Sequence, residues 1–197
     1  MSRRPISLTT PLSDRDVSGL DVGDLVHLSG VLYTARDAAH ERFAKTLGEG
    51  GALPFDPLGQ VIYYVGPTPA RPGHCIGSAG PTTASRMDPY AVLLIERGLK
   101  GMIGKGRRND VVLAAMKKFQ CVYFGAVEGT AALIARKIQS CQVIAYEDLG
   151  TEAVCRLVVK ELPVVVVNDT RGGDLYKEGR EPYRRAHTGS PGADKQA

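Results

Sequence analysis

Residues 101–124 read GMIGKGRRNDVVLAAMKKFQCVYF, and this stretch decides the fold class. It opens with a short apolar strand, Gly101–Ile103, which is followed by a tight turn at Gly104-Lys105-Gly106. Residues Asp110–Phe119 then have the apolar spacing of a helix, and Cys121–Phe124 read as a second apolar strand. A strand, a helix and a strand in this order predict a βαβ unit, which is typical of an α/β fold.

The alternation of strands and helices continues on both sides of this unit. Toward the N-terminus, the patterns predict strands at Asp24–Ser29, Val31–Thr34 and Val61–Val65, and helices at Arg36–Leu47 and from Asp88 to Gly98. Toward the C-terminus, they predict a helix at Thr130–Ile138 and strands at Gln142–Tyr146, Val154–Val159 and Pro163–Asn168. We therefore expect one α/β domain over residues 24–176.

The two ends of the chain differ from this pattern. Residues 1–23 are polar and contain Pro5, Pro11 and Gly19, so they predict an extended N-terminal arm. Residues 177–197 are charged and contain Gly and Pro, which predicts a largely disordered C-terminal tail.

Composition limits the class of protein. The chain has 197 residues, of which 43% are hydrophobic and 23% charged, as in an ordinary globular protein. No stretch approaches the roughly 18 consecutive apolar residues of a membrane helix, and no apolar segment follows Arg3 and Arg4 as a signal peptide requires. We therefore expect a cytoplasmic protein.

The net charge of +4 is too small to indicate a nucleic-acid-binding protein. The basic residues Lys105, Arg107, Arg108, Lys117 and Lys118 also lack interleaved aromatic residues on a strand.

The four cysteines predict no metal site. Cys75, Cys121, Cys141 and Cys155 are widely spaced, without a C-x-x-C pair. The adjacent His74 and Cys75 do not have the spacing of a zinc site. We therefore expect four reduced thiols with structural roles.

Three segments combine glycine, hydroxyl and cationic residues at junctions that lead into helices. They are residues 33–40 (YTARDAAH), 80–88 (GPTTASRMD) and 104–108 (GKGRR). Because the N–H groups at a helix N-terminus attract anions, these segments predict a site for a carboxylate or a phosphate.

Structural roles are the alternative at each segment. Thr34, Thr82 and Thr83 have the residue type of helix caps, and His40 has that of a buried, hydrogen-bonded side chain. Arg36 is consistent with an exposed helix position, and residues 105–108 with a solvated basic turn.

Three common site motifs are absent from the sequence. A phosphate loop around Gly104-Lys105 would need glycine at Leu99 and Ser or Thr at Gly106. There is no G-x-G-x-x-G after a strand and no G-x-S-x-G, so the sequence indicates neither dinucleotide binding nor a serine nucleophile elbow.

Together the three segments resemble the β subunit, or C-terminal catalytic domain, of class I iron–sulfur fumarases and of the related tartrate dehydratases. The similar strings are residues 29–40 (SGVLYTARDAAH), 80–88 and 103–106 (IGKG). The likeness continues through residues 123–125 (YFG), 146–153 (YEDLGTEA) and 167–169 (VND) and covers about Leu25 to Tyr176.

This resemblance implies a swivelling β/β/α domain, a single domain with a mixed sheet and flanking helices. It also implies that the chain supplies half of a hydro-lyase active site. In the family, a partner α subunit or N-terminal domain carries a [4Fe–4S] cluster whose open iron acts as a Lewis acid on the leaving hydroxyl. None of the four cysteines here stands in a family cluster motif, so we expect the cluster on the partner only.

The resemblance also implies roles for individual residues. Arg36, Arg86 and Lys105 would bind the substrate carboxylates, and Thr82 would place its hydroxyl at the reacting carbon. The residues expected behind them are Asp37, which would orient an arginine, His40, which would hydrogen-bond the wall of the site, and Thr83.

Fumarate and (S)-malate are the substrates that these strings favour, with tartrate and methyl-substituted dicarboxylates as alternatives. The chain departs from the family at Val127-Glu128-Gly129-Thr130 and at Arg107-Arg108. A different class of function also stays open, in which the chain is a stand-alone anion-binding or regulatory module. An apolar docking surface for the α subunit would favour self-association of the isolated chain.

Overall fold

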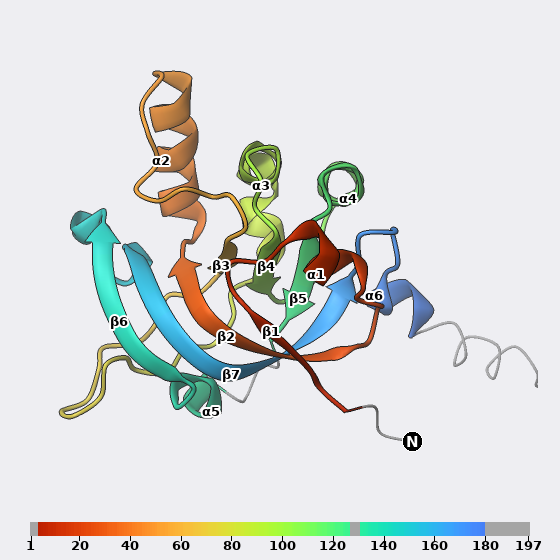
Figure 1. Cartoon of the computed structure of the whole chain (residues 1–197). Coiled ribbons are helices and arrows are strands. Elements are labelled where there is room, and N and C mark those ends of the chain that lie inside the picture. Colours follow the sequence, from red (N-terminus) through yellow and green to blue (C-terminus); the bar gives the residue numbers. More distant parts are fainter. Residues whose placement is uncertain (1–3, 127–130, 180–197) are drawn as a thin grey trace, which may run out of the picture.

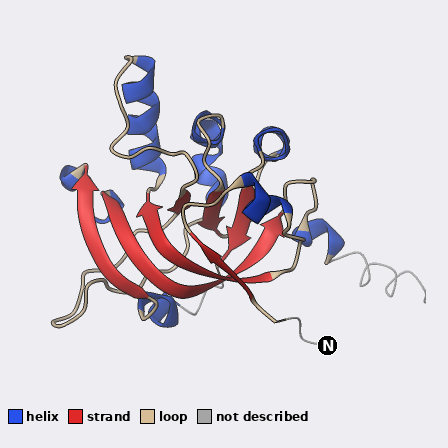
Figure 2. Ribbon diagram, viewed as in Figure 1, coloured by secondary structure: helices blue, strands red, loops and turns tan. Residues whose placement is uncertain are grey.

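The computed structural model describes residues 4–126 and 131–179. A single seven-stranded sheet, with strand order β1-β2-β3-β4-β5-β7-β6, forms the centre of the molecule (Figures 1 and 2). Its strands are β1 (Ile6–Thr9), β2 (Leu25–Thr34), β3 (Val61–Tyr63), β4 (Gly101–Gly104), β5 (Val122–Gly125), β6 (Ile138–Ala145) and β7 (Val154–Asn168).

Helices connect and cover these strands. The α-helices are α1 (Asp14–Ser18), α2 (Asp37–Gly48), α3 (Asp88–Ile95), α4 (Asp110–Phe119), α5 (Ala131–Ala135) and α6 (Leu175–Glu178). Two 3₁₀ segments, η1 (Ala84–Met87) and η2 (Glu147–Glu152), lie directly before α3 and β7.

The sheet closes on itself because β7 pairs with both β5 and β2. Strands β2, β3, β4 and β5 are parallel neighbours, and β7 runs antiparallel to β5 on one side and to β2 on the other. The result is a five-stranded mixed barrel, extended by β1 beside β2 and by β6 beside β7. The expected single α/β domain with a mixed sheet and flanking helices is confirmed, and the sheet forms a closed barrel.

The middle strands are buried on both faces, and their residues alternate between two cores. Val61, Tyr63 and Val65 belong to the core inside the barrel, whereas Ile62 and Tyr64 belong to a second core outside it. The outer core is completed by buried residues of α2, α3 and α4. Burial on both faces explains the continuous apolar character of these strands, which is typical of parallel strands.

The long strands β2 and β7 differ from the sequence prediction, which divided each of them in two. Gly30 has a φ of +102°, and the β2–β7 register shifts between Leu28 and Gly30. In β7, Glu161 has a φ of 52°. Both are irregularities inside continuous strands. The sequence prediction, in which one strand ended at Ser29 and another before Pro163, is therefore wrong at these two points.

The first residues also differ from the expected extended arm. Strand β1 pairs in parallel with β2, and α1 packs Val17 against the inner core together with Leu12 and Leu20. The helix begins at a capping box between Ser13 and Asp16, a local signal that the sequence prediction did not use. Lys177 and Glu178, the first residues of the expected disordered tail, belong to α6 instead. The tail from residue 180 on and residues Val127–Thr130 lie outside the described residues.

The cysteines have different environments. Cys121 and Cys155 are buried, Cys141 is half-buried and Cys75 is exposed, and all four are free thiols. In the described part of the chain, no helix is both long and apolar enough to span a bilayer.

A glycine inside the barrel provides a test of this packing. A Cβ at Gly101 would lie 2.9 Å from Val61 Cγ2 and 3.1 Å from Phe124 Cε2, inside the inner core. We expect Gly101→Ala to lower the free energy of unfolding by about 1–3 kcal/mol, because the barrel interior has no room for an added methyl group. Urea unfolding of the purified chain measures this loss.

Gly48→Ala is the matched control. Gly48 ends α2, and a Cβ there meets no atom within 4 Å. This variant should keep or slightly raise the stability, since alanine favours a helix by up to about 1 kcal/mol over glycine. Equal effects of the two substitutions would contradict a tightly packed barrel interior.

Candidate functional site

The predicted anion-binding segments follow the carboxyl ends of neighbouring parallel strands. Arg36 comes two residues after β2, Lys105 directly follows β4, and the segment with Thr82 is bonded to the chain that continues β3. Ligands in α/β folds commonly bind at the carboxyl ends of strands. The parallel order of β2, β3 and β4 therefore places these segments on neighbouring strand ends.

Backbone hydrogen bonds join Thr82 to Lys105. Thr82 N donates to Tyr64 O at 2.7 Å, and Lys105 N donates to Thr82 O at 3.1 Å. Ala84 N returns a bond to Lys105 O at 2.8 Å. Residues 82–84 and Lys105 thus form a fixed unit, with Thr82 and Lys105 half-buried and Thr83 exposed.

Gly104 permits this close approach. A Cβ on Gly104 would lie 2.9 Å from Tyr64 Cδ2 and 3.3 Å from Thr82 O. Only a residue without a side chain lets residues 82–84 lie this close to the end of β4, which gives Gly104 in the 103–106 string a structural reason.

Arg36 lies between a glycine and a carboxylate. Its Nη2 atom is 3.1 Å from Glu152 Oε1, and a Cβ on Gly66 would lie 2.5 Å from Arg36 Nη1. Glu152 Oε2 also accepts a hydrogen bond from Ala38 N at 3.3 Å, in the first turn of α2. Glu152 therefore fixes both the guanidinium and the start of the helix, a role that the sequence did not indicate.

Arg86 and Asp37 form a second ion pair, with Arg86 Nη2 2.6 Å from Asp37 Oδ2. Burial alone would raise the pKa of the Asp37 carboxyl, but the hydrogen bond from Arg86 and the charges of Arg86 and Arg36 outweigh it. The pKa of Asp37 is therefore lowered, and this residue is a carboxylate at neutral pH. The Arg86 side chain is 47% exposed, so a ligand can reach it.

A shallow pocket of about 380 Å³ lies beside this ion pair. Its lining includes Arg86 together with the carboxylates of Asp37 and Glu41. Two carboxylates against one guanidinium make this pocket unsuitable by itself for a doubly charged anion.

His40 supports Arg36 from the interior. His40 is fully buried, its ring packs edge-on against Tyr64, and its Nδ1 lies 2.8 Å from Arg36 O. A carbonyl only accepts hydrogen bonds, so we assign the ring proton to Nδ1. Burial lowers the pKa of His40 to about 4, and the imidazole is neutral at pH 7.

The purely structural roles considered for these residues are found for some of them and not for others. Thr34 does not cap α2: its hydroxyl donates to Ala153 O at 3.2 Å and accepts from Cys155 N at 2.9 Å. Thr83 stands at the N-cap of η1 without a side-chain capping bond. His40 has the buried, bonded role that was its structural alternative, and Arg36 is largely buried instead of exposed.

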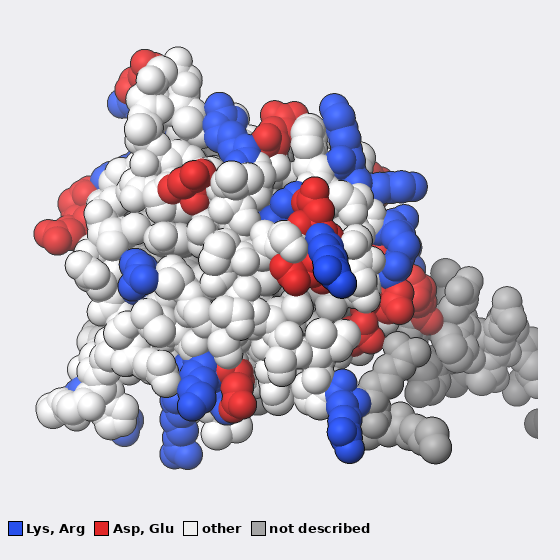
Figure 3. Space-filling model, in the orientation of Figure 1, with Lys and Arg blue, Asp and Glu red and all other residues white. Residues whose placement is uncertain are grey.

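The basic turn at residues 105–108 is not one solvated surface. Arg108 is buried, with Nε 2.8 Å from Asp88 Oδ1 and Nη1 donating to Tyr64 Oη at 3.1 Å. Arg107 is exposed beside the ring of Tyr176. Figure 3 shows basic and acidic side chains interspersed over the face in view, which agrees with the weak indication of nucleic-acid binding in the sequence.

A metal ion needs several ligand side chains that meet at one point. Within residues 4–126 and 131–179, no three His, Cys, Asp or Glu side chains are grouped so that they could hold a metal ion.

Comparisons with known proteins point to one family. The family model described as Fumarase C-terminus matches residues 1–179. The chain is 37% identical over 166 residues to fumarate hydratase 2 of Leishmania major, and 33% identical over 177 residues to the aerobic class I fumarate hydratase of Escherichia coli K12. These alignments cover 83% and 88% of this chain, but 29% and 32% of the two relatives. The chain thus spans about a third of the length of these fumarate hydratases.

A shorter relative matches along most of its length. The chain is 34% identical over 174 residues to a protein described as L(+)-tartrate dehydratase subunit beta, from Methanocaldococcus jannaschii. This alignment covers 85% of the chain and 89% of the relative.

The environment of His40 predicts a pH dependence of stability. An unfolded histidine has a pKa near 6.5, so between pH 7 and 5 the unfolded chain takes up a proton that folded His40, with a pKa of about 4, does not. The contribution of His40 to the free energy of unfolding is full above pH 6.5 and is lost as the pH falls toward 4. We expect His40 to contribute a loss of about 2 kcal/mol between pH 7 and 5.

Urea unfolding at pH 7 and pH 5 measures this contribution. The pH-dependent loss should shrink by about that amount in His40→Gln, which keeps a hydrogen-bond donor but does not titrate, and should persist in His74→Gln, which changes an exposed histidine. The comparison is between the two pH values within each variant, so a general loss of stability in His40→Gln does not affect it. An unchanged pH dependence in His40→Gln would contradict a buried, neutral imidazole.

Proposed function

This chain belongs to the Fumarase C-terminus family, which class I fumarate hydratases and β-type tartrate dehydratases share, and from this membership we propose that it is the β subunit of an iron–sulfur hydro-lyase. The proposed reaction is the reversible hydration of fumarate to (S)-malate. The chain would supply the carboxylate-binding half of the active site.

One observation carries this proposal. Arg36, Arg86 and Lys105, which the sequence separates widely, all stand on segments at the carboxyl ends of three adjacent parallel strands, with Thr82 bonded directly beside Lys105. Removal of water from a 2-hydroxy dicarboxylate builds up negative charge next to a carboxylate. Cationic side chains around a hydroxyl group are suited to stabilise that charge.

The contacts of each cation suggest its part in binding. Asp37 holds Arg86 and Glu152 holds Arg36, so both guanidinium groups are oriented before a substrate arrives. An oriented guanidinium binds a carboxylate through two parallel hydrogen bonds, whereas the ammonium of Lys105 acts as a compact charge. We propose that these three groups bind the two carboxylates of the substrate.

Thr82 is the residue proposed to exchange a proton at the reacting carbon. A threonine hydroxyl is a weak acid by itself, so it needs a neighbouring positive charge to act in this way. We propose Lys105 for this role, because its backbone N–H donates a hydrogen bond to Thr82 O and so holds the two residues next to each other.

The iron–sulfur cluster is assigned to a partner. Cys121 and Cys155 are buried in separate cores, and no three His, Cys, Asp or Glu side chains of the described residues are grouped so that they could hold a metal ion. The described residues therefore do not fit the cluster, and we propose that an α subunit holds it and would supply the Lewis acid.

Tartrate is the second candidate substrate, because the tartrate dehydratase β subunit aligns with this chain over most of both lengths. The first test is an anaerobic assay of malate-to-fumarate conversion with this chain alone, and with this chain mixed with an iron-loaded α subunit from the same organism. We expect activity in the mixture only. A parallel assay with tartrate discriminates between the two substrates, and failure of the two chains to form a complex would favour a stand-alone anion-binding module.

Arg86→Ala tests the carboxylate contact in the assembled enzyme. Loss of a charged hydrogen-bond partner of a carboxylate costs about 2–5 kcal/mol, so we expect kcat/KM to fall at least about 30-fold. Arg97→Ala is the matched control, because Arg97 is exposed just after α3 and its side chain donates to the backbone oxygen of Leu93. Turnover of Arg86→Ala near that of Arg97→Ala would remove Arg86 from the site.

A further inference from the structure

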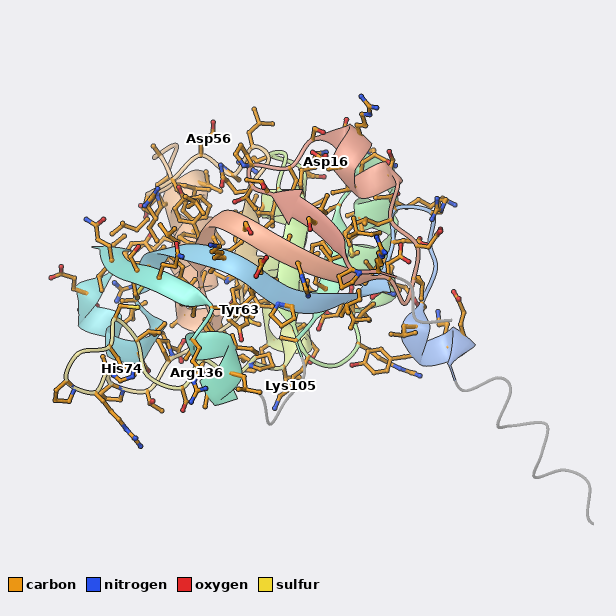
Figure 4. All side chains as sticks on the ribbon, turned by 60° about the horizontal axis from the view of Figure 1, so that its bottom comes forward. Asp16, Asp56, Tyr63, His74, Lys105 and Arg136 are labelled. Carbon is orange, nitrogen blue, oxygen red and sulfur yellow. The ribbon has the colours of Figure 1, made fainter. Side chains whose placement is uncertain are left out.

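A second cavity, of about 620 Å³, lies between the loop that follows β3 and the segment from α5 into β6. Its walls come from residues 68–78 on one side and from residues 132–139 on the other. His74 and Arg136, which belong to opposite walls, lie along the same side of the barrel as Lys105 in Figure 4. The volume is within the range of small-molecule pockets, roughly 300–1,000 Å³.

The loop wall has a fixed conformation. Thr68 N donates to Ser78 O at 3.1 Å, and Ser78 N donates to Thr68 Oγ1 at 2.9 Å, so these two residues close the loop at its base. Ile76 is buried in the inner core, and Cys75 Sγ donates to Ile138 O at 3.4 Å across the cavity wall. These contacts fix the base of the loop and join it to the opposite wall of the cavity.

Arginine residues outnumber acidic residues in the lining of this cavity. Arg71, His74 and Arg136 line it, and no Asp or Glu does so among the residues that the structure describes. Arg36 and Arg86 each lie against a carboxylate, but neither Arg71 nor Arg136 has an ion pair within residues 4–126 and 131–179. Two uncommitted guanidinium groups at one concave surface are suited to bind oxyanions.

Most of the other residues that line the cavity are apolar or carry hydroxyl groups. Ile76, Ile138 and Ala135 supply apolar surface, and Thr68 and Ser78 supply hydroxyl groups. Among the described residues no Phe, Tyr or Trp lines the cavity, and the imidazole of His74 is the ring that they contribute.

We propose that this cavity is a second anion site, which binds a small organic molecule with at least two acidic groups through Arg71 and Arg136. The acidic groups are carboxylates or phosphates, and both have the oxygen geometry that a guanidinium recognises. The site is separate from the cluster of Arg36, Arg86 and Lys105, none of which lines the cavity.

Isothermal titration calorimetry of the full chain with citrate and, separately, with pyrophosphate tests this proposal and identifies the preferred acidic group. At fixed ionic strength, we expect one of the two probes to bind with a stoichiometry of one. Its affinity should fall at least tenfold in the double variant Arg71→Gln/Arg136→Gln. It should change less than twofold in Arg15→Gln/Arg97→Gln, which removes the same charge from exposed arginines outside the cavity.

A second measurement locates the bound probe. The ring proton signals of His74, assigned with His74→Gln, should shift when the probe is added to the parent chain, and Arg86→Gln should leave both the shift and the affinity intact. The proposal is wrong if neither probe binds, if the cavity variant keeps its affinity, or if the charge-matched control loses as much. It is also wrong if Arg86→Gln abolishes binding, since the probe would then occupy the proposed substrate site.

These measurements use this chain alone and do not depend on catalysis. The hydro-lyase assay and the titration therefore fail independently of each other. If the cavity variant binds the α subunit more weakly and neither probe binds the parent chain, the cavity receives an acidic segment of the partner, and the small-molecule proposal is overturned.

Discussion

The antiparallel pairing of β2 with β7 closes the sheet and sets the position of Arg36. It joins Leu25–Tyr33 to Arg156–Val165 and turns an open row of parallel strands into a barrel. A closed barrel leaves its five strands without an open edge and gives it an interior that side chains fill. The same pairing aligns the end of β2 with the start of β7, where Thr34 bonds to Ala153 and Cys155 and where Glu152 reaches Arg36. The same strand pairing therefore closes the barrel and positions Arg36, a proposed substrate-binding residue.

The two groups of arginines differ in what holds them. Arg36 and Arg86 are oriented by Glu152 and Asp37, and the lowered pKa of Asp37 keeps its charge over the neutral range. Such pairing reduces the net charge near a ligand but fixes the direction of each guanidinium, which favours recognition of one carboxylate geometry. Arg71 and Arg136 lack such partners in the described chain, so their cavity offers more net charge and less orientation. This contrast is consistent with a specific substrate at the first group and a less strictly defined anion at the second.

The sequence predicted local structure well where the signals were local. The bounds of α4 match the prediction because Asn109 caps its first turn and its apolar residues repeat at helical spacing. The closure between β2 and β7 was not predictable from the sequence pattern, because it joins segments more than a hundred residues apart and no local pattern encodes a partner. The pairs Arg36–Glu152 and Arg108–Asp88 were missed for the same reason. The three segments with glycine, hydroxyl and cation were recognisable in the sequence, because each lies next to a strand end or the start of a helix. Their role as an anion site stays a prediction.

The exposure of these residues bears on how the proposed reaction could proceed. Almost half of the Arg86 side chain is open to solvent, and Thr83 beside Thr82 is exposed. Charge stabilisation at a reacting carbon is strong only where water is excluded, because the high dielectric constant of water weakens each interaction. The described residues form one wall of a site without a cover, so the proposed chemistry requires a second surface above this wall. A cluster-bearing partner docked over Arg86 and Thr82 would supply the Lewis acid and would also exclude water from the site. The reaction needs both a Lewis acid and a dry site, and this is a physical reason for dividing such an active site between two chains.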